Sequence, residues 1–438
     1  MSVAKRWGPY TQMSSLKETG PMIIDRAQGV YVWDEAGRRY LDAHAGLWLA
    51  NIGYGRSEII DAVALQAQKL SWFSSFGGFS NRPSMALAER LINLLEPDGM
   101  GSVFFSNDGS EAVETALKIS RQYWKARGMA QKFKLIGRHH AYHGVTMGAL
   151  SVAGITLNRQ AFEPLLTGVR HAPAPYRQHC TFHPNDSICS LACAREVERI
   201  IQFEGSGTVA AFIAEPIQAA GGVIIPSRDY LRQVRDICRR YDVLFIADEV
   251  VTGFGRLGDW TGSRYYGIQP DLMTFAKGIT SGYLPLGATA VAPHIMETFI
   301  AQSQDGPEFR HGNTYSGHPL ASAAALANID IIENEGLLEH AAQMGDYLHR
   351  QLLSLSSQFS ALVTDADCVG LLGRVEIISS SEGAGKRGAK MARHMLDNGV
   401  IVRPVGDVIT LSPPLIITEP EIDFLIDALR EALQAVGD

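Results

Sequence analysis

The hydrophobic positions of the chain form two patterns that alternate through its central part. Apolar runs predict strands at residues 102–106 (SVFFS), 209–214 (VAAFIA) and 243–247 (VLFIA). The continuous run at 209–214 is typical of a strand buried on both faces. Apolar residues at helical spacing predict helices, and they occur at residues 84–95, 111–128 and 230–241. Strands that alternate with helices predict an α/β fold whose sheet is mostly parallel.

The two ends of the chain follow a different pattern. Near the amino terminus, GVYVWDEAGRRYLD places two alternating runs around a turn, which predicts a β-hairpin. From about residue 330 the pattern predicts helices, two short strands around Arg403 and Thr410, and a last helix with a capping box at Thr418. We therefore expect a large domain over residues 63–329 and a smaller α+β domain built from residues 1–62 and 330–438.

Composition and charge narrow the classes of partner. The chain has 438 residues with 39 Lys and Arg against 46 Asp and Glu, so its formal charge is −7 and no basic face for nucleic acid is expected. The amino terminus lacks the apolar core of a signal peptide, and the longest weakly polar run, residues 145–157, is too short to span a bilayer. These features predict a cytoplasmic protein that has neither nucleic acid nor a membrane as a partner.

The five cysteines argue for reduced thiols, since their number is odd and small for a chain of this length. Five residues of types that bind zinc do gather in one stretch, namely His179, Cys180, His183, Cys189 and Cys193. Paired C-x2-C spacing is absent from that stretch, and Cys193 falls in a predicted helix. We therefore favour a structural loop there and expect no metal site.

Ionisable residues stand where predicted strands end. Asp248 follows the run at residues 243–247, and Lys277 ends the next apolar run. In an open α/β sheet, ligands lie at the carboxyl ends of the strands, so a carboxylate and an amine at two strand ends can face one cavity. This pair suits pyridoxal 5′-phosphate (PLP), which needs a lysine amine for a Schiff base and an anion beside its ring nitrogen. Glu215 is a third charged residue at a strand end.

Two loops have a ligand-binding interpretation beside a structural one. Residues 107–110 (NDGS) open a strongly helical stretch, and the free N–H groups of a helix start bind phosphate. The same residue types also form ordinary helix caps. Residues 138–144 (RHHAYHG) follow a strand predicted at 133–137, so their tyrosine can stack on a flat cofactor, or the segment is a polar loop.

Four further features keep a structural interpretation beside a functional one. Trp48 is by default a packing residue, and the aromatic loop 71–83 has apolar side chains to bury in its own core or in a partner's. Thr314 and Ser316 precede a helix, where hydroxyls donate to phosphate or cap the helix. Residues 253–258 (GFGRLG) match a dinucleotide fingerprint, but no helix follows directly, so a glycine-rich loop is the better interpretation.

Together these segments resemble the class III (fold type I) PLP-dependent aminotransferases, most closely the ω-amino acid or amine:pyruvate transaminases. The resemblance covers nearly the whole chain and rests on GVYVWDEAGRRYLD, AGLWLANIGYG, NDGSEAVETALK, YHG, AEPIQAAGG, ADEVVTGFGR, FAKG, NTYSGHP and VRPVGDVITLSPPL. It implies a large domain with a mostly parallel seven-stranded sheet and a smaller α+β domain. It also implies a homodimer whose active site lies at the subunit interface, with a tetramer left open.

The resemblance further implies roles in binding the cofactor. Lys277 is expected to bind PLP covalently and to move the substrate proton, and Asp248 to keep the ring nitrogen protonated. Gly109 and Ser110 match the phosphate-binding helix start, and Thr314 matches a residue that reaches the phosphate from the other subunit. The other cofactor-binding positions implied are Tyr142 and Val250, on opposite faces of the ring, His143 and Glu215.

For the substrate, the resemblance implies an aromatic pocket with one arginine. Trp48, Tyr142 and Phe76, the last from the partner subunit, match pocket residues. Arg403 matches the arginine that pairs with the carboxylate of a keto acid and swings aside for a carboxylate-free amine. Glu215 matches a position that pairs with such an arginine in γ-aminobutyrate transaminases.

Two residues depart from the pattern of the family. Asp108 stands where many relatives have Ser, which places an extra carboxylate beside the expected phosphate site. Asn313 stands where several relatives have Phe, and this change concerns the pocket and hence the substrate.

The function implied is ping-pong transamination of a primary amine or an ω-amino acid, with pyruvate as the expected keto acid. Within the fold, PYTQM, FGGFS and RPVG are also similar to 7,8-diaminononanoate synthase, which uses S-adenosylmethionine as the amino donor, and a PLP-dependent lyase is a second alternative. Two alternatives lie outside this class of enzyme: an NAD-dependent oxidoreductase that uses GFGRLG, and a protein that holds the cofactor without catalysing a reaction. The sequence does not identify the amine donor.

Overall fold

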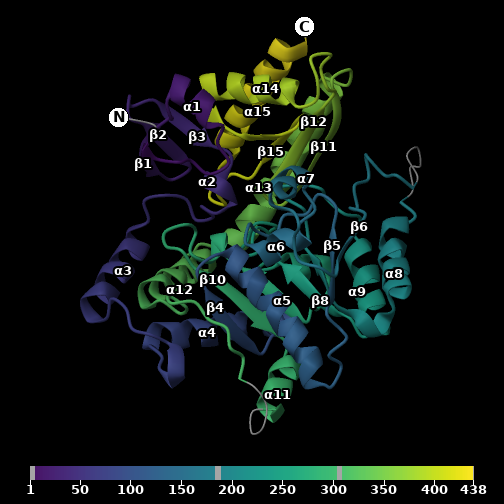
Figure 1. The fold of residues 1–438 in the computed structure, drawn as a ribbon. Helices are drawn as coiled ribbons and strands as arrows, with labels where there is room; N and C mark the ends of the chain where they lie inside the picture. The colour runs from purple at the N-terminus through teal and green to yellow at the C-terminus, as the bar shows by residue number, and fades with distance from the viewer. Residues whose placement is uncertain (1–4, 183–188, 303–307, 438) are drawn as a thin grey trace.

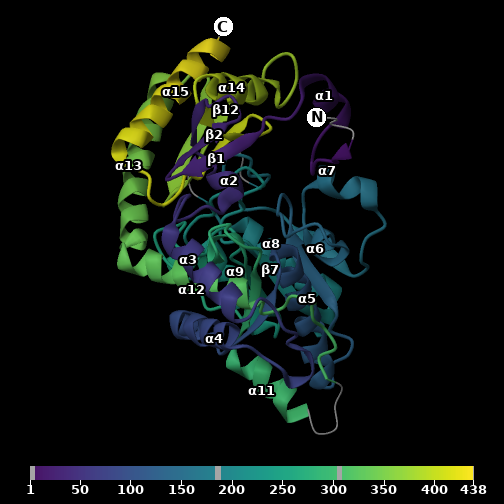
Figure 2. The ribbon, with the colours of Figure 1, turned by 90° about the vertical axis from the view of Figure 1, so that its left-hand side faces the viewer.

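The structure, a computed structural model, describes residues 5–182, 189–302 and 308–437. Both ends of the chain lie in the upper part of Figure 1, and the lower part is built around a large sheet. In Figure 2 the long helix α13 (Leu337–Gln358) runs along one side and connects the two parts. No described helix is long and apolar enough to cross a membrane.

The large sheet has seven strands, as predicted. In spatial order they are β4 (Ser102–Ser106), β10 (Gly287–Val291), β9 (Leu272–Phe275), β8 (Leu244–Asp248), β7 (Val209–Ala214), β5 (Lys134–Arg138) and β6 (Val169–Ala172). The strands from β9 to β6 pair in parallel, and β10 is antiparallel to both of its neighbours. The carboxyl ends of β5, β7, β8 and β9 therefore meet at one edge, where functional side chains are expected.

The central strands are buried because helices cover both faces of the sheet. Every residue of β7, β8, β9 and β10 is buried. Side chains of β8 alternate between the faces: Leu244 and Ile246 pack with α5 (Gly109–Ala126), and Phe245 and Ala247 with α9 (Tyr230–Arg240). Continuous apolar runs are required in such strands, which explains why the sequence identified them.

Caps decide where several helices begin. Helix α4 (Arg82–Leu95) starts two residues before the predicted start because the side chain of Asn81 accepts a hydrogen bond from the N–H of Ser84 (2.9 Å). Helix α12 (Pro319–Asn334) is capped by His318, which accepts from the N–H of Leu320 (3.2 Å). The hydroxyls of Thr314 and Ser316, which the sequence offered for this cap, are not used for it.

The other described helices are α1 (Met13–Thr19), α2 (Ala45–Trp48), α3 (Ser57–Lys69), α6 (Met147–Val152), α7 (Thr156–Arg159), α8 (Ala192–Glu204), α10 (Gly262–Tyr266), α11 (Pro293–Gln302), α14 (Lys386–Asp397) and α15 (Glu419–Gly437).

Two four-stranded sheets form the other part of the molecule. One has the order β1 (Ile24–Gln28), β2 (Tyr31–Asp34), β3 (Arg39–Asp42) and β13 (Val400–Ile401), and the other β11 (Val363–Val369), β12 (Leu372–Ile377), β15 (Val408–Leu411) and β14 (Arg403–Val405). The predicted hairpin is β2 and β3, and the predicted strands around Arg403 and Thr410 are β14 and β15, in which those two residues are partners. Since β13 pairs with β3, residues from the two ends of the chain share a sheet.

The predicted domain boundaries fall inside two helices. The boundary after residue 62 lies in α3 and the boundary after residue 329 lies in α12, and these helices contact each other. The division into residues 63–329 and the two terminal segments therefore stays a prediction.

Candidate active site

Asp248 is the last residue of β8 and is buried at the edge where the parallel strands end. One of its carboxylate oxygens lies 2.6 Å from Nδ1 of His143. The other accepts hydrogen bonds from the Thr274 hydroxyl (3.1 Å) and the N–H of Val250 (3.2 Å). Three partners fix the orientation of this carboxylate, which leaves it a defined anion at the base of the site.

His143 belongs to the loop after β5, and its ring is also buried. Strand β7 lies between β5 and β8, so the contact of His143 with Asp248 reaches across one strand of the sheet. Thr274, on β9, was not identified from the sequence because LMTF is typical of any buried strand.

Lys277 follows β9, the neighbour of β8, so the two residues that first suggested PLP stand at adjacent strand ends. Its backbone has a φ of 47°, the left-handed region that a non-glycine residue rarely adopts, and such strain concentrates at functional sites. Burial lowers the pKa of its amine, and the carboxylates of Asp248 and Glu215 oppose that shift. The neutral amine, which is the nucleophilic form, is therefore more accessible than in a solvated lysine.

Glu215, just after β7, holds the loop that carries Tyr142. Its two carboxylate oxygens accept hydrogen bonds from the N–H of Tyr142 (3.0 Å) and the N–H of Ala219 (3.1 Å). Burial is the main cause that raises the pKa of Glu215 to about 7. Within the described residues it forms no ion pair with Arg403, unlike the pairing implied by γ-aminobutyrate transaminases.

The segment at the start of α5 has both a cap and free donors. The side chain of Asp108 accepts a hydrogen bond from the N–H of Glu111 (2.9 Å), so Asp108 is the cap of the helix. The N–H groups of Gly109 and Ser110 have no acceptor among the described residues, as expected in a first helical turn. A Cβ added at Gly109 would lie 3.0 Å from the side chain of Val250, so these two predicted cofactor positions are in contact.

The predicted substrate residues Trp48 and Arg403 form a stacked pair. The Arg403 guanidinium carbon lies 5.0 Å from the centre of the Trp48 ring, and Trp48 is buried. Tyr142 interacts with this arginine: burial and the Tyr10 hydroxyl raise the pKa of the Tyr142 hydroxyl, and Arg403 opposes that shift. Tyr10, from PYTQM, was noted in the sequence only as a resemblance to 7,8-diaminononanoate synthase.

Phe76 and Thr314 have no described contact with the residues at the strand ends. Phe76 is 53% exposed, and a Cβ added at Gly312 would lie 2.9 Å from its ring, so the two segments adjoin. Thr314 is also exposed. Within the described part of the chain, no hydrogen bond, ion pair or ring contact joins either residue to Lys277 or Asp248.

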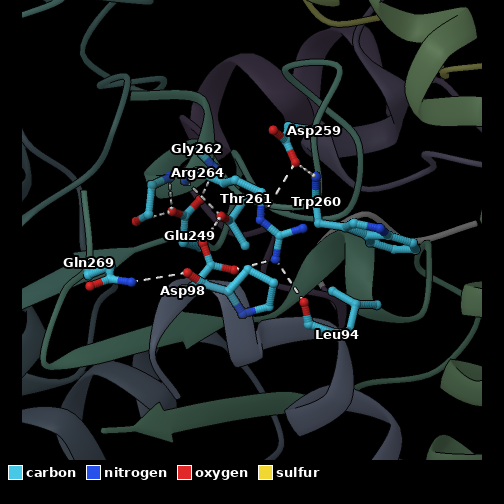
Figure 3. A network of polar contacts seen from close by, with 11 residues as sticks. Leu94, Asp98, Glu249, Asp259, Trp260, Thr261, Gly262, Arg264 and Gln269 are labelled. Carbon is cyan, nitrogen blue, oxygen red and sulfur yellow. Dashed lines mark hydrogen bonds and ion pairs between the residues drawn. The ribbon is translucent and has the colours of Figure 1, made fainter. Parts of the chain in front are cut away.

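Glu249 is a second buried carboxylate beside Asp248, but its contacts are structural (Figure 3). It accepts hydrogen bonds from the N–H of Gly262 (2.8 Å), from the N–H and hydroxyl of Ser263 (both 2.6 Å) and from the Thr252 hydroxyl. Thr252 lies in the loop after β8, and Gly262 and Ser263 are the first two residues of α10. Glu249 therefore ties the end of β8 to α10 and has no capacity left for a ligand.

The GFGRLG segment, residues 253–258, is a loop between β8 and α10, as predicted, and not the turn of a dinucleotide site. Its arginine, Arg256, is fully buried. The guanidinium donates to the side chain of Asn51 (2.7 Å) and to the carbonyls of Leu371 (3.1 Å) and Pro413. The loop thus joins segments from both ends of the chain to the large sheet.

The Cys/His stretch shows no metal-binding geometry among the described residues, where no group of three or more His, Cys, Asp or Glu is arranged to hold an ion. His183 lies outside the described residues. His179 instead contacts Glu376 through Nε2 (2.6 Å), and the predicted helix that contains Cys193 is α8.

Comparison with known proteins decides the family. The family model described as "Aminotransferase class-III" matches residues 13–433. The chain belongs to this family. This class-III aminotransferase is 41% identical over 431 residues to the putrescine–pyruvate aminotransferase of Pseudomonas aeruginosa, with 97% of this chain and 93% of the relative covered. The adenosylmethionine-8-amino-7-oxononanoate aminotransferase of Geobacter sulfurreducens is 37% identical over 438 residues, with 98% and 96% covered.

Solved structures agree with the family. An amine transaminase from an uncultivated Pseudomonas species, in a PLP-bound form, has a TM-score of 0.94 and 38% identity and covers 99% of each chain. The chain is therefore a PLP-dependent aminotransferase of fold type I, as the sequence predicted.

The residues of this class-III aminotransferase fit PLP in their chemistry. Lys277 has a buried amine, Asp248 is an oriented carboxylate, and the N–H groups of Gly109 and Ser110 have no acceptor among the described residues, so these four residues could hold the cofactor. The buried Oε1 of Gln218 also has no partner among the described residues, and a bound polar group would satisfy it. Gln218 was not singled out in the sequence, although it lies in the quoted motif AEPIQAAGG.

Proposed function

We propose that the enzyme transfers an amino group from a primary amine or an ω-amino acid to a keto acid, with pyruvate as acceptor, in a ping-pong reaction. The observation that carries this proposal is the Arg403 guanidinium, which is stacked on Trp48 and has no ion-pair partner among the described residues. An unpaired guanidinium in an aromatic pocket is suited to a planar carboxylate. The P. aeruginosa relative is named for putrescine and pyruvate, which supports an amine donor combined with pyruvate as acceptor.

PLP, when bound, supplies the carbonyl that condenses with the amine and the ring that accepts its electrons. Lys277 would hold it and then use the free amine to move a proton at the substrate carbon, a step worth about 10²–10⁴ in rate. Asp248 would hold a proton on the ring nitrogen, and His143 and Thr274 fix the carboxylate for that task. Gly109 and Ser110 would anchor the phosphate.

The two substrates differ in charge, and Arg403 is placed to distinguish them. A keto acid brings a carboxylate that pairs with the guanidinium, whereas a carboxylate-free amine leaves it without a counter-ion. Glu215 forms no ion pair with Arg403 among the described residues, and its oxygens accept from the N–H groups of Tyr142 and Ala219. The guanidinium therefore stays available for the acceptor.

We also propose a homodimer that completes each site. The loop predicted to need burial carries exposed aromatic side chains, and a patch of this kind marks an interface. They are Trp72 (38% exposed), Phe73 (51%), Phe76 (53%) and Phe79 (61%). A second copy would bury this surface and would bring Phe76 and Thr314 to the site of its partner. Light scattering tests the dimer, which Phe79→Glu should weaken.

A panel of amine donors tests the reaction. Putrescine, β-alanine, taurine, 1-phenylethylamine and S-adenosylmethionine are each mixed with the PLP-loaded enzyme, and the loss of PLP absorbance is followed. We expect a diamine or ω-amino acid to react, and pyruvate then to yield alanine. If no donor changes the absorbance, or if Lys277→Ala turns over normally, the proposal is wrong.

A second candidate is retained in the panel because of one contact. Tyr10 of PYTQM interacts with the Tyr142 hydroxyl, and the G. sulfurreducens relative is named for the adenosylmethionine reaction. Reaction with S-adenosylmethionine alone would favour that function. Release of ammonia without any keto acid would instead indicate a lyase.

A further inference from the structure

His44 is a buried residue near the proposed site that the reaction described above does not use. It precedes α2, a segment with left-handed backbone angles at Ala45 (φ 45°), Gly46 (φ 66°) and Trp48 (φ 60°). The side chain of Asp42 holds this turn, accepting from the N–H of His44 (3.1 Å) and of Gly46 (2.6 Å). Asp42 thus holds a strained backbone at Ala45 and Trp48, which indicates that the directions of the His44 and Trp48 side chains are important for the site.

The ring of His44 packs against Trp48. Their ring centres are 4.3 Å apart at 71°, an edge-to-face contact, and the Arg403 guanidinium lies over the same indole at 5.0 Å. On its other side, Nδ1 of His44 is 3.5 Å from the hydroxyl of Ser412, which follows β15. Since β15 pairs with β14, the strand of Arg403, His44 contacts both the indole and the hairpin that carries the guanidinium.

Burial is the main cause that lowers the pKa of His44 to about 3, and the basic residues Arg403, Arg256 and Lys277 add to this shift. The imidazole is thus neutral at every pH of an ordinary assay. A neutral ring can support the indole without repelling the guanidinium stacked on it.

We propose that His44 is a positioning residue that supports Trp48 and, through it, Arg403, and so sets the preference of the enzyme for acceptors that carry a carboxylate. The proposal rests on the role proposed above for Arg403. Acceptors without a carboxylate do not use the guanidinium, so they do not depend on His44.

Two matched variants test this role. His44→Leu removes the ring at similar volume, and His44→Phe keeps a ring for the edge-to-face contact. Acceptor kinetics are measured with pyruvate and with propanal, using the preferred donor of the panel. We expect His44→Leu to raise the KM for pyruvate by about fivefold to tenfold with little change in kcat or in kcat/KM for propanal. His44→Phe should stay within about threefold of the parent enzyme for both acceptors.

Several outcomes would overturn the proposal. An unchanged pyruvate KM in His44→Leu, an equal loss for both acceptors, or a His44→Phe variant as impaired as His44→Leu each contradicts it. PLP absorbance and thermal unfolding report whether each variant is folded and loaded, and a variant pair that fails to load PLP also contradicts a positioning role. Arg403→Ala tests the proposed role of Arg403 separately from that of His44. If this variant keeps the preference for pyruvate over propanal, the proposed role of Arg403 itself is wrong.

Discussion

Removing the charge of Asp248, at the end of β8, should lower turnover strongly and leave the fold intact. In Asp248→Asn, the side-chain oxygen can keep its bonds to the Thr274 hydroxyl and the Val250 N–H. Only the bond to His143 changes, from a charge-assisted bond of 2.6 Å to a neutral one. That loss costs about 1 kcal/mol, and the removal of a buried charge offsets part of it.

The effect on activity should be far larger. Asn cannot hold a proton on the ring nitrogen by charge, so the stabilisation that the site gives to the developing negative charge falls. We expect kcat to drop at least about 100-fold, which corresponds to about 2.7 kcal/mol. Turnover is measured per bound PLP, and the free energy of unfolding is taken from urea titrations of the same preparations.

Glu249→Gln is the matched control, because it makes the same exchange at the next residue. Each oxygen of Glu249 accepts one hydrogen bond from an N–H group and one from a hydroxyl. An amide NH2 in place of either oxygen leaves that N–H without an acceptor, and we expect a loss of about 1–3 kcal/mol in stability. The kcat of folded, PLP-loaded Glu249→Gln should be nearly that of the parent enzyme. If Asp248→Asn keeps more than about a tenth of the turnover, or if both variants lose it equally, the reasoning is refuted.

Three further predictions follow from single side chains. Burial raises the pKa of Glu215 from 4.5 to about 7, so between pH 4.5 and pH 7 the folded apoenzyme binds more protons than the unfolded chain. The free energy of unfolding should therefore fall by about 3 kcal/mol as the pH rises through this range. Glu215→Gln should flatten this slope in urea titrations, and an unchanged slope contradicts the assignment. Asp108→Ser keeps a cap while removing a charge near the phosphate site, so equilibrium dialysis should show PLP binding about threefold to tenfold tighter, not weaker. Arg256→Met leaves the Asn51 oxygen and two carbonyls without their donor, so the free energy of unfolding in urea should fall by about 3–5 kcal/mol. Unchanged stability would contradict the conclusion that this loop joins the two ends of the chain to the large sheet.

The features that could be predicted from the sequence are those with a local signature. A strand buried on both faces is mostly apolar, so the ends of β8 and β9 could be located, and with them Asp248 and Lys277. Parallel neighbours end at one edge, which placed those two residues together. The seven-stranded sheet, by contrast, was implied by the resemblance to a family.

The features that could not be predicted depend on contacts between distant elements. The pairing of His143 with Asp248 requires the order β5, β7, β8, which no local pattern gives. Thr274 is indistinguishable from a core residue, and His44 acquires its neighbours only when the segments that follow β3 and β15 meet, as the bond from the Ser412 N–H to the Ala43 carbonyl shows. The proposed contributions of Phe76 and Thr314 depend on a second chain altogether.

The most direct test of the central claim separates the two half-reactions. PLP-loaded enzyme is mixed with the preferred donor in the absence of any keto acid, and pyruvate is added afterwards. The account predicts loss of PLP absorbance with carbonyl product stoichiometric with the active sites, then recovery of the absorbance with an equal amount of alanine, and neither event in Lys277→Ala. Product that continues to form without keto acid, or that forms only when both substrates are present, would contradict it.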